Sequence, residues 1–143
     1  MEAATTIVPI HIDEDVSSLS AILLNDDFYD FMLKGRIVIN GLSVLKTSYI
    51  IPFKMMAWIN LMSEKEEGKH VNARDLKKHK NDVFQLLQII PEGETVEVTG
   101  DVSDAVDKFL EIIVNENIVF ANLDIESDMD TEIKALREIY IKI

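Results

Sequence analysis

The spacing of apolar side chains along the chain predicts several helices. Apolar positions three or four residues apart mark segments that are mostly opened by residues favoured at helix N-caps: 15–24, 26–35, 47–63, 72–90, 103–113 and 131–140. Gly35 is expected to end the second segment, and Ser103 to cap the fifth. Pro52 lies too deep in the third for a first-turn proline, so we expect it to bend that helix or delay its start.

Shorter β-branched segments predict strands. Arg36–Ile39 and Leu42–Leu45 flank Asn40-Gly41, a dipeptide that tolerates positive φ at both centres of a type I′ turn, and this pattern predicts a hairpin. Segment 94–98 alternates with period two, and segment 7–12 is expected at a sheet edge because it contains a proline. The chain is therefore predicted to be α+β, with short strands and a hairpin packed on about five helices, and with 48–63 and 72–90 as the central helix pair.

Length and composition narrow the class of protein. With 143 residues and 48% hydrophobic residues, the chain is predicted to be one domain, 1–143, with a strand, helix and hairpin part at 1–46 and a mainly helical part at 47–143. The absence of cysteine excludes disulfides, thiolate zinc sites and cysteine nucleophiles. Short apolar runs and an N-terminus unlike a signal peptide lead us to expect a cytoplasmic protein with no membrane partner.

Charge is large and unevenly distributed. The chain has 26 acidic and 14 Lys or Arg side chains, a net charge of −12, which disfavours duplex nucleic acid as a partner. Basic residues gather at 65–80, whereas most charged residues after Pro91 are acidic. The run Lys77, Lys78, His79 and Lys80 repels itself unless something negative lies nearby. Two alternatives are open: a bound anion, or an internal ion-pair face supplied by the chain's own carboxylates.

Two segments carry a resemblance to a known family. In 49–58, Lys54 and Ala57 match a Leu-Ile-x-x-Lys-x-x-Ala helix; in 75–86, Lys80 and Asp82 match a basic Lys-Asp motif with Asn81 inserted. This pattern resembles the C-terminal half of AbiEii-like nucleotidyltransferases, which include toxins of bacterial abortive-infection (type IV toxin–antitoxin) systems. The resemblance covers roughly residues 11–90 and implies a partial nucleotidyltransferase-like fold.

The same resemblance implies a nucleotide or phosphate ligand. The residues that would touch or organise phosphate are Lys54, Lys77, Lys80 and Asp82. For Lys54, the alternative is a lysine on the polar stripe of an amphipathic helix, and for Asp82 a solvated helix carboxylate.

The chain departs from the family at the catalytic motif. Family members place a Gly-Gly or Gly-Ser turn and an Asp-x-Asp strand upstream of these segments, but here no glycine precedes Gly35. Phosphoryl-type transfer needs carboxylates that hold Mg²⁺, so we assign no catalytic residue and no metal ligand, and expect Mg²⁺ only if the missing half is supplied. Asp13 and Asp15 are the other metal candidates, but their place before a helix is typical of capping. The three histidines are too scattered for zinc.

Two functions follow as hypotheses. The first is an AbiEii-type protein that is catalytically incomplete alone and binds nucleotides or phosphates. The partial family fold implies an incomplete sheet with an unpaired edge, which favours a homo-oligomer or docking to another chain. The alternative is a non-catalytic protein-interaction module whose acidic half after Pro91 binds a basic partner.

Overall fold

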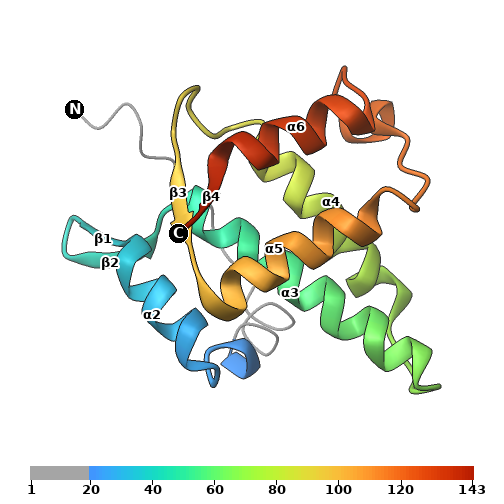
Figure 1. Ribbon diagram of the computed structural model, residues 1–143, viewed down its shortest axis with the longest axis horizontal. Coiled ribbons are helices and arrows are strands. Elements are labelled where there is room, and N and C mark those ends of the chain that lie inside the picture. The colour runs from blue at the N-terminus through green and yellow to red at the C-terminus, as the bar shows by residue number, and fades with distance from the viewer. Residues whose placement is uncertain (1–19) are drawn as a thin grey trace.

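A computed structural model describes residues 20–143 and shows the predicted α+β class (Figure 1). The elements, in chain order, are α2 (Asp26–Gly35), β1 (Arg36–Ile39), β2 (Leu42–Leu45), α3 (Thr47–Glu66), α4 (Ala73–Leu87), β3 (Val96–Val98), α5 (Gly100–Ile113), the 3₁₀ helix η1 (Phe120–Leu123), α6 (Met129–Ile139) and β4 (Tyr140–Lys142). The strand predicted at 7–12 and the candidates Asp13 and Asp15 lie outside the described residues.

The helices α3 and α4 form the central pair, as the sequence predicted. They make the most extensive contact between any two described elements, and α5 packs on α3 from another side. The shared core contains the fully buried Trp58 of α3, Phe84 of α4 and Phe109 of α5, with Phe109 in edge-to-face contact with Trp58. In Figure 1, α2 and the hairpin lie at the left, and α3 to α6 occupy the middle and right.

Pro52 does not delay the start of α3, so the delay, one of the two effects expected of it, was wrong. The helix begins at Thr47 and continues through Pro52 to Glu66. A proline in a helix cannot donate to the carbonyl four residues earlier, which here belongs to Ser48. The Tyr140 hydroxyl donates to that carbonyl at 2.6 Å, and the missing helix bond is replaced from the other end of the chain.

The hairpin and its turn agree with the prediction. Strands β1 and β2 are antiparallel, with Arg36 opposite Leu45 and Ile39 opposite Leu42. Asn40 and Gly41 have φ values of 52° and 80°, the positive φ pair of a type I′ turn. Gly35 ends α2, also as expected.

Only one strand of the second sheet was predicted from the sequence: β3 lies within the predicted segment 94–98, but its partner was not foreseen. Strands β3 and β4 pair in parallel, with Val96 opposite Tyr140 and Val98 opposite Lys142. The predicted helix at 131–140 ends at Ile139, and Tyr140 begins a strand instead. Tertiary pairing overrides the local helix pattern here, because the side chain of Tyr140 is buried and its partner strand lies far away in the sequence.

The N-terminus of α5 differs from the prediction in its cap. Ser103 was expected to cap this helix, but α5 begins at Gly100 and Ser103 is buried inside it. The cap comes from another helix: the Asp27 carboxylate accepts a hydrogen bond from the Asp101 backbone N–H at 2.7 Å. Asn25, which caps α2, donates from its side chain to the Asp101 carboxylate, also at 2.7 Å. The starts of α2 and α5 are thereby joined.

Candidate functional site

The helix α4 presents the basic run. Asn72 begins it, and its side-chain oxygen accepts from the backbone N–H groups of Arg74 and Asp75 at 2.8 and 3.3 Å. Val83 and Phe84 face the core and are fully buried. The remaining faces of the helix therefore carry the lysines and Asp82 toward α3, toward the connection between α5 and α6, and toward solvent.

Lys54 and Asp82 meet between α3 and α4. The Lys54 Nζ lies 3.0 Å from the Asp82 Oδ2, and the Lys78 Nζ lies 3.1 Å from the same oxygen. Lys54 is buried with 5% of its surface exposed, while the side chains of Lys78 and Asp82 keep 27% and 22%. One carboxylate oxygen thus joins two ammonium groups at the edge of the core, and we call these three residues the lysine–aspartate cluster.

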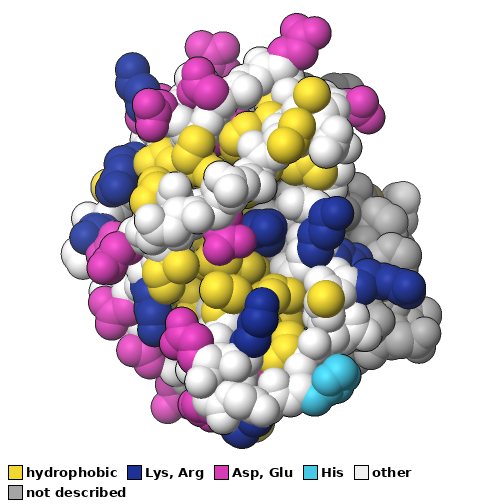
Figure 2. Space-filling view, turned by 90° about the vertical axis from the view of Figure 1, so that its right-hand side faces the viewer, with side chains coloured by type: hydrophobic (Ala, Val, Ile, Leu, Met, Phe, Trp, Pro, Cys, Tyr) yellow, Lys and Arg dark blue, Asp and Glu magenta, His cyan; other side chains and the backbone are white. Residues whose placement is uncertain are grey.

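Lys80 and Lys77 lie apart from this cluster. The Lys80 Nζ makes an ion pair of 3.2 Å with the Glu116 carboxylate, which follows α5, and Lys77 is exposed. Figure 2 views the side of the molecule on which the connection between α5 and α6 lies, with acidic side chains along the upper edge and Lys and Arg side chains across the middle.

The structure thus brings two of the four predicted site residues into direct contact. Lys54 and Asp82 come from the two segments that carry the family resemblance, and their contact is an ion pair. The internal ion-pair face weighed as an alternative to a bound anion is present, since Lys54, Lys78 and Lys80 all face carboxylates of the chain.

Two members of this network were not among the predicted site residues. Lys78 stands four residues before Asp82, a spacing that favours an ion pair on one helix face, so the sequence did contain a signal for it. Glu116 lies in the connection between α5 and α6, for which the sequence predicts neither a helix nor a strand. No local signal could have matched it with Lys80.

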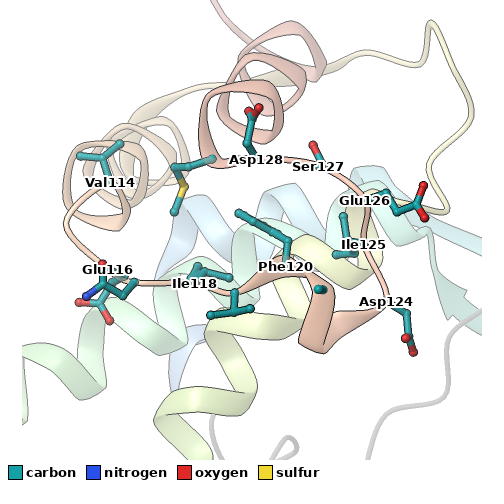
Figure 3. A pocket seen from close by; sticks show the side chains of 13 residues that line it. Val114, Glu116, Ile118, Phe120, Asp124, Ile125, Glu126, Ser127 and Asp128 are labelled. Carbon is teal, nitrogen blue, oxygen red and sulfur yellow. The ribbon is translucent and has the colours of Figure 1, made fainter.

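The connection between α5 and α6 lines an open cavity of about 930 Å³. In Figure 3, Phe120 points into the ring formed by this segment, Asp124 and Glu126 point away from it, and Glu116 lies at its edge. Asp124 has a φ of 58° and ends η1, which turns the chain back toward α6. The lining residues are Val114, Glu116–Ala121 and Asp124–Met129.

Asp128, at the end of this connection, caps α6. The backbone N–H of Thr131 donates to the Asp128 carboxylate at 2.8 Å, and this hydrogen bond lowers the pKa of Asp128.

The described residues offer no metal centre. No group of three or more His, Asp or Glu side chains within 20–143 could hold a metal ion, so the residues in this part of the chain do not fit the Mg²⁺ that the family resemblance implies. We therefore derive no reaction step through a metal.

Two further findings concern membrane spans and known proteins. In the range that the structure describes, no helix is long and apolar enough to cross a bilayer. Comparison of the chain with family models, with curated proteins and with solved structures finds no match in any of the three.

Proposed function

We propose that this chain corresponds to the C-terminal portion of an AbiEii-type nucleotidyltransferase, and that α4 with the lysine–aspartate cluster organises the phosphate groups of a bound nucleotide. One observation carries the proposal. Lys54 and Asp82, which the resemblance selects in two separate segments, lie 3.0 Å apart with Lys54 almost fully buried. Two motifs that meet in space are better support for one shared site than two motifs that only occur in one sequence.

The cost of burying charge supports a role beyond packing. Removing an ammonium and a carboxylate from water costs several kcal/mol, and a buried ion pair is often no more stabilising than well-packed apolar residues. An ion pair at the helix contact is thus a poor choice for stability alone. Its other effect is to fix the position of Asp82, and with it Lys78, and so to hold α4, the helix that also carries Lys77 and Lys80, against α3.

Fixed lysines suit the binding of phosphate. A lysine side chain loses considerable rotamer entropy when it is held in place. If a carboxylate already holds the lysine in the free protein, less rotamer entropy is lost when the ligand binds. Lysine ammonium groups bind phosphate as point charges. In this proposal the cluster positions α4, and the exposed Lys77 and the partly exposed Lys80 touch the ligand.

Transfer of a nucleotide would require residues beyond those described. We propose that the carboxylates for Mg²⁺ come from a further segment or from another chain, and that this chain works in a homo-oligomer or docked to that second chain. The described residues would then bind and orient the nucleotide.

The test is calorimetric titration of the full chain with Mg²⁺–ATP and, in parallel, with the other nucleoside triphosphates. We expect binding that Lys77→Ala with Lys80→Ala weakens about tenfold or more, because a hydrogen bond to a charged group is worth about 1.5–3 kcal/mol. The matched control is Lys108→Ala with Lys134→Ala, which removes the same charge from exposed sites on α5 and α6. Equal weakening by both pairs, or no binding by the parent chain, would overturn the proposal.

A further inference from the structure

The connection between α5 and α6 combines a cavity with a surface of one charge. Between Lys108 and Lys134 the sequence has seven acidic residues and no Lys or Arg. Asp124, Glu126 and Asp130 in this stretch are exposed. The acidic rim thus surrounds a hollow of about 930 Å³ rather than a flat surface.

Part of the cavity wall is apolar. Phe120 and Ile125 are buried in its wall, and Ile118 and Met129 are partly buried there. At its edge, Val119 is 60% exposed, and Val114 at the end of α5 is 54% exposed. Exposed aliphatic side chains beside an apolar hollow with a polar rim are typical of surfaces that bind a partner's apolar side chain.

We propose that this cavity binds a basic amphipathic segment of a partner protein, which inserts an apolar side chain next to Phe120 and places Lys or Arg side chains against Asp124 and Glu126. Charge complementarity selects this occupant, because the exposed carboxylates of Asp124 and Glu126 at the rim attract cations and repel acidic segments. The inference goes beyond the nucleotide proposal, since none of these three residues belongs to the lysine–aspartate cluster.

Two other occupants suit the site less well. The first 19 residues contain four acidic residues and no Lys or Arg, so the rim repels them. A second copy of the chain carries the same net charge of −12, and two copies repel each other at long range. A basic partner is repelled neither by the acidic rim nor by the net negative charge of the chain.

The probe is a fluorescein-labelled amphipathic helical peptide with lysines on one face and leucines on the other. The matched control peptide carries glutamate in place of each lysine. Binding to the full chain is followed by fluorescence anisotropy at several salt concentrations. We expect the lysine peptide to bind, the glutamate peptide not to bind, and affinity to fall as salt rises.

Three variants locate the binding. Asp124→Asn with Glu126→Gln should weaken binding about fivefold, since each rim charge contributes a fraction of the affinity. Asn tolerates the positive φ of position 124, so this variant keeps the turn. Val119→Asp should weaken binding tenfold or more, and its exposed position spares the core. The control, Asp30→Asn with Glu97→Gln, changes the net charge equally at exposed sites on α2 and β3 and should bind as the parent does.

Equal weakening by the rim variant and the control would show that only net charge matters and would overturn the inference. So would sedimentation that shows a dimer dissociated by Val119→Asp, because a second copy would then occupy the cavity. Nucleotide titration of Val119→Asp separates the two proposals, since this variant should leave nucleotide affinity unchanged.

Discussion

Tyr140 donates its hydroxyl to the backbone carbonyl of Ser48 at 2.6 Å, and this carbonyl is the one that Pro52 leaves without its helical donor. Strand β4 therefore completes the first turns of α3. The contact joins the C-terminal strand to the start of α3, and it explains how a buried proline is accommodated inside a long helix.

Removing the Tyr140 hydroxyl should destabilise the fold. We expect Tyr140→Phe to lower the free energy of unfolding by about 1–2 kcal/mol, because the buried Ser48 carbonyl then loses its partner. In a Pro52→Ala background, the backbone N–H at position 52 can donate instead, so the same change should cost about 1 kcal/mol less. Urea unfolding of the four proteins gives this coupling. Equal costs in both backgrounds would show that the proline and the tyrosine are independent.

Alkaline pH should destabilise the protein through the same tyrosine. Burial, followed by the charge of Glu94 and the nearby Tyr49, raises the pKa of Tyr140 well above 10.0. The folded state therefore keeps a proton that the unfolded chain loses near pH 10, so the stability is fully present below that pH and falls as pH rises, by up to about 1.4 kcal/mol per pH unit. Urea midpoints at pH 9 and 11 should fall more steeply for the parent than for Tyr140→Phe. Parallel slopes would contradict the assignment.

The ion pair between α3 and α4 gives a third prediction. Lys54→Met should cost about 2 kcal/mol of stability, because Asp82 then loses the buried one of the two lysines that flank it. Adding Asp82→Leu should restore much of that loss, since an apolar pair at a helix contact needs no charge partner. Thermal and urea unfolding of both variants provide the measurement. A double variant less stable than Lys54→Met would mean that the cluster itself stabilises the fold.

Glycine at position 100 should be required for two reasons. Its φ is +56°, and a Cβ there would lie 2.3 Å from the Asp27 carboxylate that caps α5. Gly41 has a φ of +80° with open space around it, so Gly41→Ala reports the backbone strain alone. We expect Gly41→Ala to cost about 1 kcal/mol and Gly100→Ala to cost clearly more. Similar unfolding midpoints for the two variants would show that the Asp27 contact contributes nothing.

Much of the fold follows from local sequence signals. The hairpin at Asn40-Gly41 has the predicted strands and turn, and α4 begins at the predicted cap, Asn72. In these cases, the residues that determine the structure are neighbours in the sequence. Where the partner is distant, prediction failed: the cap of α5 comes from Asp27, and the strand partner of Val96 is Tyr140.

In the candidate site, too, contacts between residues close in the sequence could be predicted, and contacts that depend on a distant segment without a regular pattern could not. The pairing of Lys78 with Asp82 follows from helix spacing, and the contact between Lys54 and Asp82 agrees with the choice of these two residues from separate motifs. The pairing of Lys80 with Glu116 depends on a connection that has no regular pattern. The cavity lined by that connection could not be predicted for the same reason, because its shape depends on η1 and on the positive φ of Asp124.

The proposed phosphate site is tested most directly by NMR spectra of the lysine side-chain ammonium groups of the full chain, recorded while Mg²⁺–ATP is added. The proposal predicts that the signals of Lys77 and Lys80 shift with a common saturating dependence on nucleotide, while those of Lys108 and Lys134 stay in place. Unmoved signals on α4, or shifts of similar size at all four lysines, would contradict it.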